Sequence, residues 1–169
     1  MKKIYAIAVS LLMLVFFIPC VLSDTTVTVT GTFTATGTLQ IEVNNTSPDF
    51  GTISVSSSQT VDLQVSNTGS VAANVVQDQA VKASGSMTLS TDGTADSQDE
   101  YVVEMLSSGT GASGSWENIG DTGTHVIVNS LAASSNQAYD LRVTIGPSLS
   151  AQQHSDEQFY ANVTASSVS

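Results

Sequence analysis

A strict two-residue alternation over residues 26–43 constrains this chain more than any other feature of its sequence. Every odd position in TVTVTGTFTATGTLQIEV is apolar or Gly, and every even position is Thr, Gln or Glu. Successive side chains on a β-strand point to opposite faces, so the run predicts one apolar and one hydroxyl-rich face. Extended over its whole length it would span about 60 Å, roughly three times a usual strand. The run should therefore break at Gly37, which separates an N-terminal arm from a first body strand over 38–43.

The segment before the arm has the pattern of a secretory signal. Lys2 and Lys3 form a basic start, an apolar run follows over 4–18, and small residues precede Asp24. We therefore expect residues 1–23 to be a signal peptide and residues 24–37 to be the strand arm. No basic stop-transfer flank follows, so the pattern favours a secreted chain, extracellular or at the cell surface, with no membrane span after cleavage.

The net charge narrows the classes of partner, and the cysteine content indicates how the fold is stabilised. The chain has a formal net charge of −11, and loss of the signal would leave Lys82 and Arg142 as its strong bases against fifteen acidic residues. Such a chain is a poor partner for nucleic acid or anionic lipid. Its single cysteine, Cys20, would leave with the signal, so the mature fold would be stabilised by core burial without disulfides.

Beyond the arm, the sequence predicts an all-β domain over residues 38–169. Alternating apolar residues at 61–65 and a turn at 67–70 predict a hairpin with the next strand, 71–76. The nearly apolar run 101–106 predicts a central strand covered on both faces. About nine short strands with regularly spaced turns indicate a single antiparallel β-sandwich, Ig-like or jelly-roll.

No pattern of catalytic residues appears in the sequence. There is no Gly-x-Ser-x-Gly elbow, no Cys–His pair and no phosphate-binding Gly loop. His125 and His154 are isolated from each other and from any cysteine, which favours surface or partly packed histidines over zinc ligands. The sequence therefore predicts that the protein is not an enzyme.

One acidic loop is a candidate metal site. Asp92, Asp96, Asp99 and Glu100 place four carboxylates close together, and carboxylate oxygens are ligands for Ca²⁺. The loop lacks the alternating spacing and distal Glu of an EF-hand, so a solvated acidic loop is the favoured interpretation. We therefore expect no cofactor, with Ca²⁺ at this loop as the alternative.

Trp116 and three asparagines are further candidates. Trp116 follows a Gly/Ser-rich connection and offers an aromatic face to a sugar, although a cap on the sandwich core is the favoured interpretation. Asn44, Asn45 and Asn162 each begin an Asn-x-Ser/Thr sequon, which is a glycosylation site where the host has that pathway.

Two stretches carry a family resemblance. The stretch GTLQIEV followed by DFGTI, and the stretch VDLQVSNTGS, resemble the opening of camelysin/TasA-type secreted matrix-fibre subunits. The Thr-rich arm is similar to the donor strands of pilins in the archaic chaperone-usher class, and DFGTI with NTGS also occurs in extracellular Ig-like modules. The resemblance implies a subunit that assembles into fibres.

These observations lead to two hypotheses of different kinds. The first is a structural subunit of an extracellular filament or biofilm matrix, whose arm is donated to a second copy of the chain in a homopolymer. Its interface residues would be the apolar side and glycine of the arm, Val27, Val29, Gly31, Phe33 and Ala35. The alternative is a secreted carbohydrate- or surface-binding module that works without assembly, with other cell-surface proteins as partners. An arm that folds back into its own domain would need the same alternation.

Overall fold

The computed structural model describes residues 37–150, 154 and 156–168, and this part of the chain is all-β. Its eleven strands are β1 (Ile41–Val43), β2 (Ser58–Asn67), β3 (Ala73–Asp78), β4 (Val81–Ser84), β5 (Thr88–Leu89), β6 (Glu100–Ser107), β7 (Glu117–Asn118), β8 (Thr124–Leu131), β9 (Asn136–Ile145), β10 (Gln158–Tyr160) and β11 (Val163–Ser167). The predicted signal peptide and all of the arm except Gly37 lie outside the described residues, and so do the five predicted interface residues. No helix in the described part is long and apolar enough to cross a membrane.

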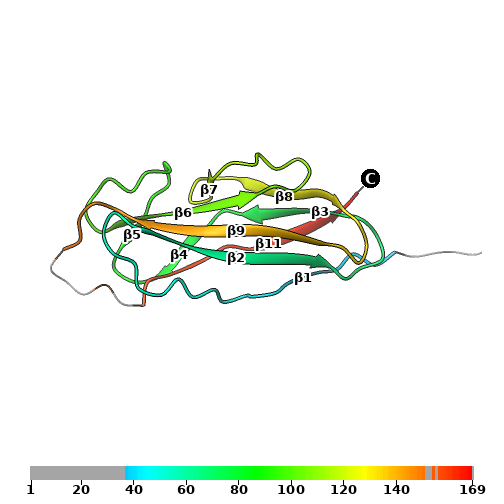
Figure 1. The fold of residues 1–169 in the computed structure, drawn as a ribbon, viewed down its shortest axis with the longest axis horizontal. Helices are drawn as coiled ribbons and strands as arrows, with labels where there is room; N and C mark the ends of the chain where they lie inside the picture. Colours follow the sequence, from blue (N-terminus) through cyan, green and yellow to red (C-terminus); the bar gives the residue numbers. More distant parts are fainter. Residues whose placement is uncertain (1–36, 151–153, 155, 169) are drawn as a thin grey trace, which may run out of the picture. The chain divides into compact units, whose positions relative to one another are not determined.

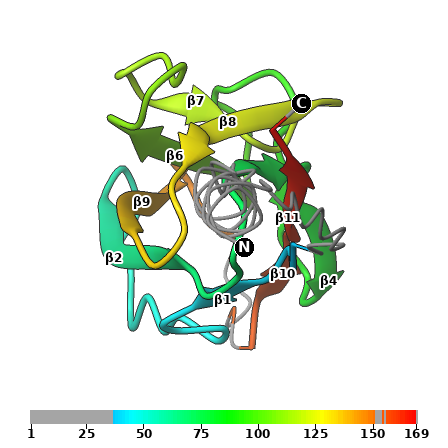
Figure 2. The same cartoon turned by 90° about the vertical axis from the view of Figure 1, so that its right-hand side faces the viewer.

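The strands form several sheets. A six-stranded sheet has the order β1-β2-β9-β6-β5, with β7 paired to β6 beside this path. A three-stranded sheet has the order β11-β3-β8, and β10 pairs with β4. Figure 1 shows the long strands β2 and β9 side by side, and the end-on view in Figure 2 places them opposite β4, β10 and β11.

The core lies between the six-stranded sheet and the other strands. Alternate residues of β2 and β9, among them Leu63, Val65 and Leu141, are buried in one cluster with Val75 of β3 and Ile127 of β8. This is the outcome expected of a period of two, because one face of each strand meets the core. Each such side chain contributes roughly 1.5–3 kcal/mol when buried. The alternation that predicted strands in the sequence therefore also assigns their inner faces.

The predicted hairpin between 61–65 and 71–76 is wrong. Its first strand belongs to β2, which pairs with β1 and β9, while β3 pairs with β8 and β11, so the turn joins two different sheets. The buried Asn67 side chain holds this corner, because its Nδ2 donates to the carbonyl oxygens of Val71 at 2.8 Å and Leu131 at 2.9 Å. Its Oδ1 accepts the backbone N–H of Gly69 at 3.0 Å.

Two other details differ from the predicted antiparallel sandwich. β5 pairs with β6 in parallel. The connection over 90–99 carries the chain back to the start of β5, so that both strands run in the same direction. The end of the chain forms two separate short strands, β10 and β11, which pair with β4 and β3 respectively. The predicted central strand over 101–106 is confirmed within β6, where Val102 and Val103 are both buried although they point to opposite faces. The all-β prediction is also confirmed, with multiple sheets that are consistent with a β-sandwich.

Candidate functional site

His125, at the start of β8, lies between two carboxylates. Its Nδ1 is 3.0 Å from Glu117 Oε2 on β7, and its Nε2 is 3.1 Å from Asp121 Oδ1 in the loop between these strands. The His125 side chain is only 12% exposed. Both ring nitrogens therefore lie within hydrogen-bond distance of a carboxylate oxygen.

His154 occupies a second site of the same kind, at the opposite end of β6 from Ser107. Its Nε2 is 2.9 Å from Asp99 Oδ1 and 3.2 Å from Ser150 Oγ. Its Nδ1 is 2.8 Å from Ser86 Oγ and 3.8 Å from Glu157 Oε1. The ring is 6% exposed, so both histidines are packed against their partners, as the sequence predicted.

Three of the four carboxylates of the predicted Ca²⁺ loop have separate hydrogen-bond partners. Asp92 Oδ1 accepts from Ser90 and Thr94, Glu100 Oε2 accepts the backbone N–H groups of residues 96 and 97, and Asp99 Oδ1 accepts the backbone N–H of Ser150 at 2.6 Å. Within residues 37–150, 154 and 156–168, no three His, Cys, Asp or Glu side chains gather as a metal site would require. The loop is thus organised by its own polar groups.

These hydrogen bonds shift the acidity of two carboxyls. The backbone N–H of Ser150, aided by His154, holds the pKa of Asp99 below its ordinary value. The backbone N–H of Thr94 and the hydroxyls of Ser90 and Thr94 do the same for the pKa of Asp92. Donors that favour the charged form of an acid lower its pKa, so both groups are anions at neutral pH.

Glu157 and Tyr101 each carry a buried oxygen without a hydrogen-bond partner. Glu157 Oε1 accepts the backbone N–H groups of Ser86 at 2.6 Å and Met87 at 3.1 Å, which leaves Oε2 unpaired. A Cβ at Gly85 would collide with this carboxylate, so the glycine makes room for it. Burial, and then the charge of Glu157, raise the pKa of Tyr101 to about 12. Tyr101 is therefore a neutral phenol in the core.

Trp116 does not cap the core, so the favoured interpretation from the sequence is wrong. The guanidinium carbon of Arg142 lies 4.0 Å from the centroid of the Trp116 ring, and Arg142 Nη2 lies 2.8 Å from Glu104 Oε2. Arg142 and Glu104 are cross-strand partners on β9 and β6, on the face opposite to the buried Leu141 and Val143. Trp116 therefore covers the outer face of the six-stranded sheet, where a ring face meets a cation.

Two aspartates oppose each other on the same outer face. Asp62 of β2 and Asp140 of β9 are direct cross-strand partners. Burial, then the negative charge of Asp62 and a hydrogen bond with it, raise the pKa of Asp140 above its ordinary value. Like charges placed directly opposite on a sheet are destabilising, so this pair weakens the fold slightly. We call Asp62, Glu104, Trp116, Asp140 and Arg142 the outer-face patch.

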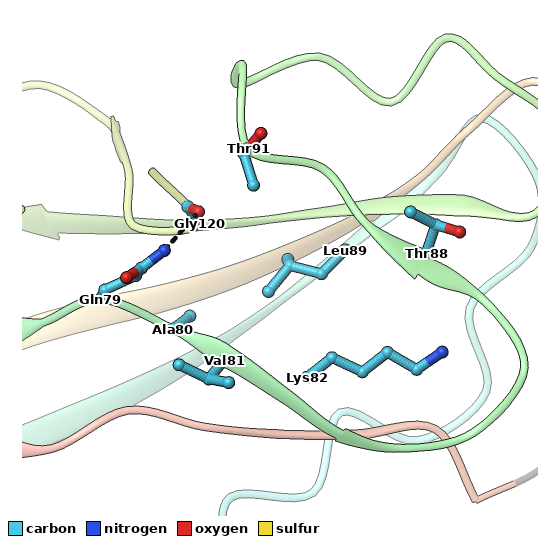
Figure 3. A pocket seen from close by; sticks show the side chains of 8 residues that line it. All are labelled: Gln79, Ala80, Val81, Lys82, Thr88, Leu89, Thr91 and Gly120. Carbon is cyan, nitrogen blue, oxygen red and sulfur yellow. Dashed lines mark hydrogen bonds between the residues drawn. The ribbon is translucent and has the colours of Figure 1, made fainter. Parts of the chain in front are cut away.

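An open depression lies between β4 and β5, close to the turn that joins them (Figure 3). Its lining residues are Gln79, Ala80, Val81, Lys82, Thr88, Leu89, Thr91 and Gly120. In Figure 3 the Gln79 amide reaches Gly120, whose carbonyl oxygen accepts its hydrogen bond at 3.3 Å. The lining has no cluster of titratable groups, so it offers no evident chemistry.

The sequon asparagines Asn44, Asn45 and Asn162 are all exposed. Asn44 Oδ1 accepts the backbone N–H of Gln64 at 2.8 Å, and Asn45 Oδ1 accepts that of Ser47 at 3.0 Å. Exposure is compatible with glycosylation, which stays a prediction. The sequence could not identify the outer-face patch, because its members come from three strands and a loop whose register no local pattern gives.

The sequence matches the family model of the sulfocyanin (SoxE) domain over residues 15–152. No curated protein matches the chain. Sulfocyanins are blue copper proteins of the cupredoxin class, and they act as electron carriers and not as enzymes.

This match corrects several expectations from the sequence. The resemblance to camelysin/TasA-type fibre subunits was misleading, and the filament function and its binding-module alternative are both overturned. The expectation of no cofactor is overturned too, because the family binds a type-1 copper ion. The prediction that the protein is not an enzyme is confirmed. The short motifs behind the resemblance describe strands and turns that many β-sandwiches share, whereas the family match spans most of the sequence. On this match, the chain belongs to the sulfocyanin (SoxE) domain family.

Proposed function

We propose that this chain, an acidic sulfocyanin-family β-sandwich, takes part in electron transfer outside the cytoplasm by binding a basic redox protein through its outer-face patch. Family membership supports the electron-transfer role. The signal-like N-terminus supports the location, and the six-stranded sheet, which shares one core with the strands of the two smaller sheets, supports a sandwich of the cupredoxin type. The observation that carries the docking role is the opposed pair Asp62 and Asp140.

Type-1 copper requires two histidines and a cysteine thiolate around one ion. The single cysteine of the chain, Cys20, lies outside the described residues, and the two histidines of the described part are held at separate sites. The described residues therefore do not fit a type-1 copper ion. The role of this chain is therefore to bind a partner, with no step at a metal ion.

The opposed aspartates favour a cationic partner. A Lys or Arg side chain placed between Asp62 and Asp140 would relieve their repulsion, and it would favour the charged form of Asp140. In the free protein the two carboxylates repel each other, and a neutral residue at either position would remove this repulsion. A basic group from a bound partner would remove it too, which favours a role for the pair in an interface.

Trp116 provides the aromatic part of the same surface, with the guanidinium of Arg142 stacked on its ring. Tryptophan and arginine are the residue types most enriched at the energetic centres of protein interfaces. Arg142 lies two residues from Asp140 on β9, so the two side chains share a face and their positions are about 7 Å apart. The outer-face patch thus combines an aromatic anchor with three carboxylates and one guanidinium.

The charge of the whole chain supports the same class of partner. A formal net charge of −11 attracts basic proteins at long range and raises their association rate, most strongly at low ionic strength. Redox proteins commonly meet through small, short-lived interfaces of this kind. We propose that this basic partner is among the cell-surface proteins.

A binding assay with a basic c-type cytochrome as the probe tests the proposal. We expect the wild-type protein to bind it and the dissociation constant to rise with ionic strength. Exchanging Asp62 and Asp140 together for Asn should weaken binding by about tenfold, since close charge pairs at interfaces are worth more than about 1.4 kcal/mol.

The matched control is the variant with Asp78→Asn and Asp96→Asn, which removes the same charge from positions outside the patch. This control should reduce binding far less than the patch variant. Equal losses in the two variants would show that only net charge matters, and absence of binding to the basic cytochrome would refute the docking role.

A further inference from the structure

Type-1 copper places strict demands on donor atoms. Two imidazole nitrogens and one thiolate sulfur surround the ion, with metal–ligand bonds of about 2.0–2.3 Å. Any two donors of one site therefore lie within about 4–4.5 Å of each other. A chain that binds this ion must bring both rings and a thiolate to one point.

The two histidines of the described part are far apart along β6. His125 contacts Glu117, whose strand partner on β6 is Met105, and His154 contacts Asp99 just before that strand begins. Asp99 and Met105 are six residues apart, which corresponds to about 20 Å of extended chain. A single ion cannot bind both rings across this separation without rearrangement of the strand.

Each ring nitrogen of the two histidines also already lies within hydrogen-bond distance of an oxygen atom. Each histidine has a carboxylate oxygen within about 3 Å of at least one nitrogen and a second polar oxygen at the other. A metal ion could bind either ring only after displacing one of these partners, which are Glu117 and Asp121 at His125 and Asp99 and Ser86 at His154.

We infer that His125 and His154 are hydrogen-bonded cross-links between neighbouring segments, and that this member of a copper family forms no type-1 copper centre. His125 joins β7 and the following loop to β8, and His154 joins the segment before β10 to the start of β6. His154 also lies beyond residues 15–152, the part that matches the family. The inference is independent of the docking role, which involves neither histidine.

Spectroscopy of the full chain, Cys20 included, tests the copper half of this inference. One equivalent of Cu²⁺ should give no intense visible thiolate-to-copper charge-transfer band and no narrow-hyperfine electron paramagnetic resonance signal. Copper taken up with only the broad-hyperfine signal of nitrogen and oxygen ligands would support the inference. An intense blue band would overturn it, and Cys20→Ser, His125→Gln and His154→Gln would then identify the ligands.

A double-mutant cycle on the metal-free protein tests the cross-link half. His125→Gln and Glu117→Gln should each lower the melting temperature, and the variant with both changes should lose less than the sum of the single losses. His154→Gln with Asp99→Asn should behave in the same way. Additive losses in both cycles would overturn the cross-link role, whether or not copper binds.

Discussion

Arg142 lies against the ring face of Trp116, with its guanidinium carbon 4.0 Å from the ring centroid. The same guanidinium is bound by Glu104, so the cation is fixed between an aromatic ring and a carboxylate on the outer side of the six-stranded sheet. The lone tryptophan of the chain thus belongs to a polar surface and not to the core.

Replacing Trp116 with Ala should lower stability modestly. The substitution removes a cation–π contact worth about 0.5–1 kcal/mol at a partly exposed site, together with the apolar cover over β6 and β9. Urea unfolding should show a lower midpoint, and Trp116→Phe should lose less because it keeps an aromatic face. Equal stability of Trp116→Ala and wild type would mean that the stacking is energetically neutral.

Asp140→Asn should stabilise the protein at neutral pH but not in acid. The folded-state pKa of Asp140 is raised, so its contribution to stability is greatest at low pH and is lost as pH rises through that pKa. Asn carries no charge and avoids this loss, so the melting temperature of the variant should exceed that of wild type at pH 7. The difference should vanish well below the pKa of an ordinary carboxyl. A loss of stability at pH 7 would contradict the repulsion between Asp62 and Asp140.

Asp99→Asn should have the opposite pH dependence. The pKa of Asp99 is lowered, so its contribution is present at neutral pH and is lost as pH falls through the folded-state pKa. The variant should therefore melt below wild type near neutral pH and approach it in acid. Asn tolerates the positive φ of 58° at this position, so the comparison isolates the charge. Melting curves of both proteins across the acid range provide the measurement.

Calcium should change the melting temperature little, because the carboxylates of Asp92, Asp99 and Glu100 each accept hydrogen bonds from separate donors. A ligand at a hundred times its dissociation constant would stabilise the folded state by about 2.7 kcal/mol, which is a shift of several degrees for a domain of this size. A shift of that size in millimolar Ca²⁺, abolished by Asp96→Asn with Asp99→Asn, would establish the site that the acidic sequence first suggested.

Local patterns in the sequence predicted much of the fold. The alternation in β2 correctly assigned which side chains face the core, and the apolar run of β6 correctly indicated burial on both faces. Pairing between strands was harder to predict. A turn sequence such as NTGS shows that the chain reverses, but not whether the next strand stays in the same sheet. The Asn67 corner depends on Leu131, which is 64 residues away.

The same limit applies to the candidate site. In the sequence, Asp62 and Asp140 looked like ordinary solvent-facing positions on two separate strands. Only the register between β2 and β9 places them directly opposite each other. The partners of His154 come from three segments, around Ser86, Asp99 and Ser150. No spacing rule in the sequence joins them. Copper, in turn, was suggested by the family alone, since the pattern of His and Cys gave no sign of it.

The corner at Asn67 also affects how the chain reaches its native state. Because β2 leaves its sequence neighbour β3 for another sheet, its long partner is β9, with Val61 opposite Leu141. A ribosome must therefore complete residues up to about Ile145 before β2 can pair with β9, and until then an alternating strand has an unsatisfied edge. Such distant pairings make folding slow, on the order of milliseconds to seconds in all-β domains. The nascent chain is thus most exposed to misassociation before β9 emerges.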